Sequence, residues 1–183
     1  MSELLDPTFL LGQLRSGLTT AMFLFLIASG LSLIFGVLKI INFAHGSLYM
    51  IGAYISWNMT LILGQTSLGF FGAVAVASVS VAILGGFVER FLLRYMYQRE
   101  QLYQLLFTYA LVLIFADACK YIWGTQPHSV SRPPILAGSF DLFGVRFPHY
   151  DLFIIFLGPL IALGFWMLLN RTSFGRTISR RRA

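Results

Sequence analysis

Apolar residues fill five long stretches of this chain, and short polar stretches separate them. A hydrocarbon layer of about 30 Å requires roughly 20 residues of α-helix, so each stretch has about the length of a transmembrane helix. The pattern predicts an all-α fold, a polytopic integral membrane helical bundle of about five transmembrane helices in a single domain over residues 1–183. The predicted spans are 17–38, 46–63, 69–88, 102–123 and 152–169.

The composition of the chain strengthens this prediction. Hydrophobic residues occupy 57% of the 183 positions and charged residues only 11%, which is more apolar material than one soluble core of this length buries. Lipid is therefore the expected solvent for much of the chain. The first ten residues, MSELLDPTFL, contain neither a basic region nor a cleavage site of small residues, so we expect the first apolar stretch to remain in the mature protein.

The formal net charge of +6 comes from basic residues that lie in short clusters between the apolar stretches, which favours membrane topology over a nucleic-acid interface. Positive charge is retained on the cytoplasmic side during insertion, and one predicted side holds nine Lys and Arg against four on the other. The nine are Lys39, Arg90, Arg94, Arg99, Arg171, Arg176, Arg180, Arg181 and Arg182, and the four are Arg15, Lys120, Arg132 and Arg146. The N-terminus is therefore predicted to lie outside. The loop 124–151, rich in Pro and Gly, is also predicted outside, and its alternating stretch SFDLFGVRF favours a small hairpin.

Small residues at four-residue spacing mark the faces on which membrane helices approach closely. The third predicted span contains two such rows, and we expect it to be central in the bundle. The rows are Gly69, Ala73, Ala77 and Ser78, Ala82, Gly86.

The most informative polar positions interrupt the stretch GLSLIFGVLKIINFAHGSLYMIGAY, residues 30–54. One interpretation makes Asn42, His45 and Gly46 a lining or hinge element of a translocation path, with His45 as a hydrogen-bonding partner. The other makes them a tight turn at the membrane interface, in which Asn42 caps the second helix and His45 faces the headgroups. The spacing alone leaves both interpretations open.

Asp117 is an acidic residue within the fourth predicted span, in LIFADACKYIW. A lone carboxylate in hydrocarbon is costly, and Lys120 follows one helical turn later. One interpretation is therefore an ion pair near the interface, and the other is a polar group that faces an outer vestibule of the path.

Several charged residues follow the third apolar stretch. Glu89 beside Arg90 predicts an interfacial charge pair, while Arg94 and Arg99 are expected to set orientation or to contact anionic lipid.

The sequence lacks the motifs of catalysis, metal binding and nucleotide hydrolysis. Cys119 is the only cysteine, and His45, His128 and His149 are far apart on different predicted sides, so no metal site is predicted. There is no GxxxxGK[ST] loop, no GxSxG elbow and no HExxH helix. We therefore expect no enzymatic activity, no catalytic residue and no cofactor.

The stretch at residues 30–54 also carries a resemblance. Its core INFAHG, followed by MIGAY, closely resembles the signature of the branched-chain amino acid ABC transporter permease family, in its first-subunit type. Further matches extend over nearly the whole chain. They are VERFLLRYMY at 88–97, WG at 123–124, the PPIL and GSF pieces of the outer loop, and NRTSFGR at 170–176.

The resemblance implies a permease subunit of the inner membrane that forms part of a translocation path for branched-chain amino acids. It implies as partners a second permease subunit, cytoplasmic ATPase subunits and a periplasmic substrate-binding protein, with membrane lipid around the helices. A permease for urea or short amides shares much of this signature and is the alternative within the class.

The chain departs from the family after NRTSFGR. Members continue through a cytoplasmic segment that docks on the ATPase and then through further spans, whereas this sequence ends in TISRRRA. The resemblance therefore implies the N-terminal part of a longer family domain, truncated at the C-terminus. A membrane fragment that does not transport is the corresponding alternative from another class.

Overall fold

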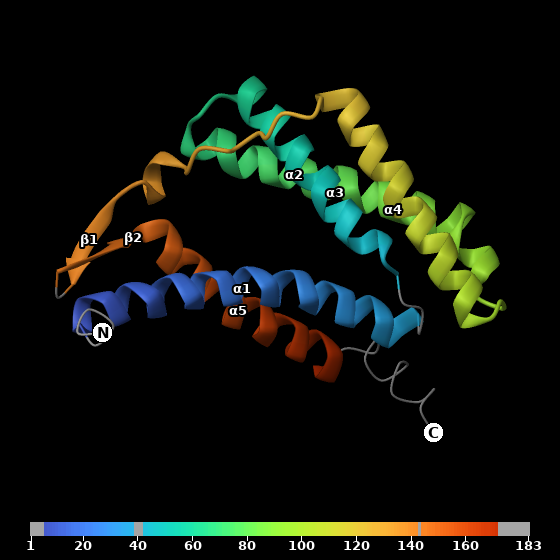
Figure 1. Ribbon diagram of the computed structural model, residues 1–183, viewed down its shortest axis with the longest axis horizontal. Coiled ribbons are helices and arrows are strands. Elements are labelled where there is room, and N and C mark those ends of the chain that lie inside the picture. Colours follow the sequence, from blue (N-terminus) through green and yellow to red (C-terminus); the bar gives the residue numbers. More distant parts are fainter. Residues whose placement is uncertain (1–5, 39–41, 143, 172–183) are drawn as a thin grey trace. The chain divides into compact units, whose positions relative to one another are not determined.

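The computed structural model describes residues 6–38, 42–142 and 144–171. Within them the chain forms five α-helices, two short 3₁₀ helices and one pair of strands (Figure 1). The α-helices are α1 (Pro7–Leu38), α2 (Ala44–Leu63), α3 (Ser67–Phe91), α4 (Gln101–Trp123) and α5 (His149–Arg171). The shorter elements are η2 (Leu93–Met96), η3 (Pro134–Leu136), β1 (Ser139–Leu142) and β2 (Val145–Pro148).

Four helical segments of the described residues are long and apolar enough to cross a membrane. They are Pro7–Gly36, Ser67–Met96, Gln101–Trp123 and His149–Met167. The predicted all-α, multi-pass membrane fold is therefore confirmed. Helix α2 is not among these segments, and its 20 residues include His45, Trp57 and Asn58, so the count of about five spans stays a prediction.

The outward orientation of the N-terminus also stays a prediction. It was derived in part from Lys39 and from the basic residues of 172–183, which lie outside the described residues.

Helix α1 begins at Pro7, well before the predicted span at residue 17. Asp6 supplies the start signal, because its Oδ1 accepts a hydrogen bond from the Thr8 backbone N–H at 3.0 Å. Pro7 suits the first helical position, where no backbone N–H is needed. At 1.5 Å per residue, the 32 residues of α1 extend about 48 Å, so the helix is longer than the hydrocarbon layer that it crosses.

The chain divides into two compact units, residues Met1–Leu33 with Ile135–Ala183 (unit 1) and Ile34–Pro134 (unit 2). Nothing in this division tests the predicted single domain, which stays a prediction. Each unit is described by itself.

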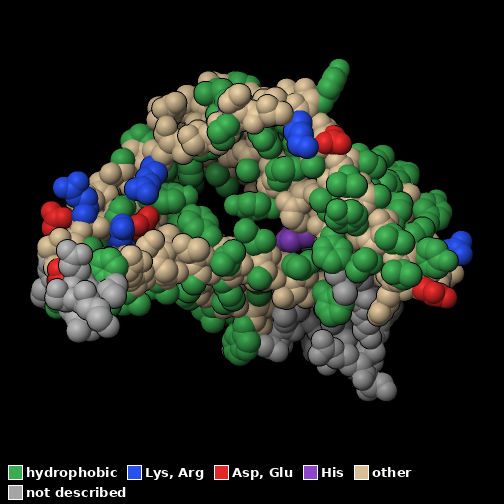
Figure 2. Space-filling model, viewed as in Figure 1, with side chains coloured by type: hydrophobic (Ala, Val, Ile, Leu, Met, Phe, Trp, Pro, Cys, Tyr) green, Lys and Arg blue, Asp and Glu red, His purple; other side chains and the backbone are tan. Residues whose placement is uncertain are grey.

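Unit 2 is built around α2, which packs along α3 and against α4. Its small core consists of the buried residues Ala44, Val88, Leu93 and Leu111. Hydrophobic side chains cover much of the visible surface of its helices, as expected for helices in lipid (Figure 2).

The first row of small residues on α3 is buried, as its spacing predicts: Gly69 and Ala77 lie at the packed face, and Ala73 is fully buried. Gly69 sits directly beneath the α2–α3 turn, where a Cβ atom would collide with the backbone oxygen of Gly64. The second row, Ser78, Ala82 and Gly86, is exposed in unit 2.

Unit 1 contains α5, the hairpin and the N-terminal part of α1. The predicted hairpin is present: β1 and β2 pair antiparallel, with Ser139 opposite Pro148 and Leu142 opposite Val145. The turn between them includes Gly144, whose φ of 78° lies in the left-handed region that glycine favours. The hairpin leads directly into α5, and the backbone N–H of His149 donates to the Gly138 carbonyl at 2.9 Å.

Candidate functional site

The turn before α2 places Asn42 and His45 together. Asn42 is buried, and its Oδ1 accepts a hydrogen bond from the Ala44 backbone N–H at 3.0 Å. The His45 backbone N–H donates to the Asn42 carbonyl at 3.3 Å. The Asn42 side chain therefore satisfies the backbone N–H of the first helical residue, while the N-cap residue itself is Phe43, which makes no side-chain cap hydrogen bond.

The two neighbouring candidates are more accessible than Asn42. The His45 side chain is half-buried, and Gly46 is exposed, with open space around the position of a Cβ atom. Gly46 is therefore not required for a close helix contact.

Asp117 lies on α4, where it forms an ion pair with Lys120 at 3.1 Å. Both side chains are exposed, and the pair has the i, i+3 spacing of neighbouring turns on one helix face. Among the described residues, no hydrogen bond or ion pair joins Asp117 to Asn42 or His45. The structure thus brings together the candidates at the start of α2, and gives Asp117 a separate partner on its own helix.

A cluster of aromatic rings at the end of α4 was not predicted from the sequence. The Trp57 and His128 rings stack at a centroid distance of 3.8 Å, and the Tyr54 and Trp123 rings stack at 5.1 Å. His128 Nε2 also lies 3.1 Å from the Trp123 carbonyl oxygen, to which it donates when that nitrogen carries the proton. The cluster fastens the segment after α4 to the side of α2.

One polar atom of this aromatic cluster lacks a hydrogen-bond partner among the described residues. The indole Nε1 of Trp123 is buried and has no hydrogen-bond partner within the described part of the chain. A buried donor of this kind is available to a water molecule or to a polar group of a bound molecule. Tyr54 and Trp57 lie in the middle of the predicted second span and His128 lies in the predicted outer loop, so no local sequence signal points to their pairing, which depends on the fold.

An ion pair in unit 1 was also not predicted. Arg15 on α1 and Asp151 in the first turn of α5 lie 2.9 Å apart, and 24% and 12% of their side chains are exposed. Because a carboxylate in the first turn of a helix is favoured by the helix dipole, Asp151 is well placed to hold the Arg15 guanidinium. In the sequence these two residues have opposite charges next to two different apolar stretches, which is a weak signal for a pair.

Comparison with known proteins gives one consistent result. A family model described as "Branched-chain amino acid transport system / permease component" matches residues 13–181. The high-affinity branched-chain amino acid transport system permease protein BraD of Pseudomonas aeruginosa is 26% identical over 176 residues, which cover 91% of this chain and 57% of BraD. The corresponding permease proteins LivH of Escherichia coli and Salmonella typhimurium are 35% identical over 79 residues, or 38% of this chain and 26% of theirs.

The chain therefore spans little more than half the length of BraD. No solved structure matches it.

Proposed function

Because this chain belongs to the family of branched-chain amino acid transport permease components, we propose that it is a transmembrane subunit of an ABC importer for branched-chain amino acids. The observation that carries the proposal is the family match over residues 13–181. The multi-pass helical fold in the inner membrane supports it, since a permease needs helices that enclose a path for solute.

In this proposal the chain shapes the path, and partners supply energy and substrate capture. The sequence has no phosphate-binding loop, so ATP hydrolysis belongs to cytoplasmic ATPase subunits. A second permease subunit would complete the path, and a periplasmic binding protein would deliver the amino acid. ATP-bound partners bias the permease only through contacts that differ between its outward and inward states.

We assign the turn before α2 to the path. Asn42 holds the start of the helix through the Ala44 N–H, so that His45 projects from a fixed backbone. His45 is half-buried and Gly46 is exposed, which leaves the imidazole accessible to a passing solute. Polar groups at the break between two apolar segments are the groups that a membrane path uses.

Asp117 has a second, separate role in the proposal. With Lys120 it provides an exposed ion pair on α4 at the predicted outer end of the bundle. A charge pair of this kind offers a zwitterionic amino acid one group of each sign.

The experiment is uptake of radiolabelled leucine by cells that lack their own system and express this chain together with its partner subunits. Variants Asn42→Ala and His45→Ala are compared with Ser78→Ala, which removes a hydroxyl from an exposed face of α3. We expect leucine uptake with the unchanged chain, a reduced rate with the first two variants, and an unchanged rate with the third.

Uptake of urea or acetamide without uptake of leucine would show that the substrates are urea or short amides and not branched-chain amino acids. Absence of uptake for every solute, with normal amounts of all subunits in the membrane, would overturn the proposal. An equal rate for all three variants would remove Asn42 and His45 from the path.

A further inference from the structure

The connection between α3 and α4 contains a pocket of about 450 Å³. It is lined by Arg94, Tyr95 and Gln98, on η2 and the turn that follows. The guanidinium of Arg presents five N–H donors in a planar fork, and the phenol and the amide add further donors. This set of groups is suited to an oxyanion, above all to the oxygens of a phosphate.

Two interactions fix the backbone around this pocket. Leu93, with 3% of its surface exposed, packs into the core of unit 2 with Val88 and Leu111. On the other side, the side-chain amide of Gln104 donates to the Met96 carbonyl at 3.1 Å and to the Arg99 carbonyl at 2.8 Å. These contacts hold the backbone that carries Arg94, Tyr95 and Gln98, whose own side chains are exposed.

The nearby acid Glu89 does not neutralise Arg94. Its Oε1 accepts a hydrogen bond from the Tyr97 hydroxyl at 2.6 Å, and among the described residues no ion pair joins Glu89 to Arg90 or Arg94. Burial and this bond to Glu89 together raise the pKa of Tyr97 to about 12. The Arg94 guanidinium is therefore left for another anion.

The pocket lies at a membrane face whichever way the chain is oriented. The segments Ser67–Met96 and Gln101–Trp123 are both apolar enough to span. Arg94 and Tyr95 are among the last three residues of the first segment and Gln98 lies in the connection, so all three are expected in the headgroup zone. On the preceding turns of α3, Phe87 and Phe91 expose 53% and 55% of their surface and pack together at a ring-centroid distance of 4.7 Å. Exposed apolar rings of this kind suit the acyl chains of a phospholipid, while the Arg94 guanidinium suits its phosphate.

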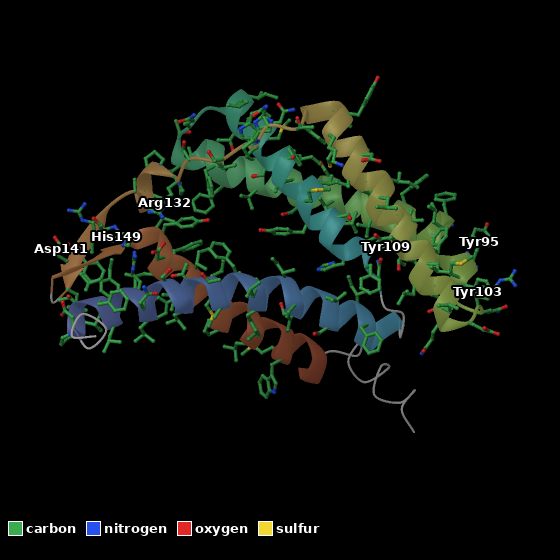
Figure 3. The ribbon with its side chains drawn as sticks, in the orientation of Figure 1. Tyr95, Tyr103, Tyr109, Arg132, Asp141 and His149 are labelled. Carbon is green, nitrogen blue, oxygen red and sulfur yellow. The ribbon has the colours of Figure 1, made fainter. Side chains whose placement is uncertain are left out.

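Tyrosines around this end of the unit fit the same depth in a membrane. Tyr95 and Tyr103 expose 71% and 58% of their surface, and Figure 3 shows both at the end of unit 2 where α3 is connected to α4. Amphipathic rings of this type favour the interface between headgroups and hydrocarbon.

We propose that Arg94, Tyr95 and Gln98 bind the phosphate headgroup of an anionic phospholipid such as phosphatidylglycerol, with Phe87 and Phe91 against its acyl chains. A soluble phosphate would use the same three polar groups, but it would leave the two exposed rings without a role. The site is independent of the solute that the permease carries.

The test measures binding of phosphatidylglycerol to the purified full chain in neutral detergent, by native mass spectrometry across a lipid titration. Arg94→Gln removes the central cation. Arg99→Gln is the matched control, because it removes the same charge from the same connection at a residue that does not line the pocket. Equal melting temperatures of the three proteins would show that they remain folded.

We expect Arg94→Gln to weaken phosphatidylglycerol binding about fivefold, and Arg99→Gln to change it less than about twofold. Phosphatidylcholine, which has no net charge, should bind weakly to all three proteins. An equal loss in both variants would mean that only general charge attraction acts, and no loss in either would mean that no site exists; both results overturn the proposal.

A parallel titration with inorganic phosphate distinguishes the two sources of the anion. Failure of phosphate to displace the lipid supports a phospholipid site. Displacement of phosphatidylglycerol at equal concentration would overturn the assignment to lipid.

Discussion

Replacement of Asp151 by Asn should destabilise the protein through the ion pair with Arg15. The substitution keeps the size and shape of the side chain, but it leaves the guanidinium without its counter-charge. At the observed 2.9 Å, two unit charges attract by about 6 kcal/mol for an effective dielectric constant near 20, and desolvation offsets much of this attraction.

Loss of one partner from a fully buried pair costs about 3–5 kcal/mol. About a quarter of the Arg15 side chain is exposed, so water screens part of the interaction. We therefore expect Asp151→Asn to lower the free energy of unfolding by about 2 kcal/mol, or roughly thirtyfold in the ratio of folded to unfolded protein. The assay is unfolding in mixed micelles with increasing SDS, followed by tryptophan fluorescence.

A double-mutant cycle isolates the pair, which is necessary because Asp151 has a further interaction in the structure. Arg15→Gln, Asp151→Asn and the double variant should show a coupling energy of about 1 kcal/mol or more. The control Asp141→Asn removes the exposed cross-strand pair with Arg146, at 3.8 Å, and should cost less than about 0.5 kcal/mol. Additivity within about 0.3 kcal/mol at Arg15 and Asp151 would refute the reasoning.

Two further predictions concern unit 2. Gly69→Ala should lower the free energy of unfolding by about 1–3 kcal/mol, because the new Cβ atom would meet the Gly64 backbone. The control Gly86→Ala lies in open space on the same helix and should be neutral or slightly stabilising. Both variants are measured in the same SDS titration. The Tyr97 pKa of about 12 lies above the ordinary value of 10.0, so folding favours the protonated phenol. The stability that the protonated phenol contributes is complete below pH 10 and is lost as the pH rises through about 12. In an alkaline titration followed by tyrosinate absorbance, Tyr97→Phe should remove a late step and Glu89→Gln should move that step to lower pH; a step unchanged in both variants would contradict the assignment.

The fold could be predicted from the sequence where the signal was local. The length of each apolar stretch placed α3 and α4 within a few residues of their observed bounds. Alternation around a glycine predicted the hairpin, and the four-residue spacing of Gly69, Ala73 and Ala77 predicted the packed face of α3. The ion pair of Asp117 with Lys120 follows from the same kind of local spacing, since both lie on one helix.

Features that depend on distant partners could not be predicted. Arg15 and Asp151 are 136 residues apart, and each looked like an ordinary charge at the end of an apolar stretch. The same holds for His128, whose ring stacks on Trp57 from a loop that follows another helix. The early start of α1 was missed for a different reason, because apolar content alone ignores the capping oxygen of Asp6.

The polar residues of the helices show how this chain can be stable in lipid. Thr60 donates to the Ser56 carbonyl at 2.8 Å and Ser78 to the Val74 carbonyl at 2.8 Å, so these hydroxyls are satisfied within their own helices. Asn42 and Gln104 instead satisfy backbone groups next to helix ends, where regular hydrogen bonding stops. Polar groups with local partners add little attraction between helices, so close packing at positions such as Ala73 must hold α3 against its neighbours. The half-buried His45 ring differs from these groups, since it has no hydrogen bond among the described residues, and under the proposed function its imidazole is the group expected to contact the solute.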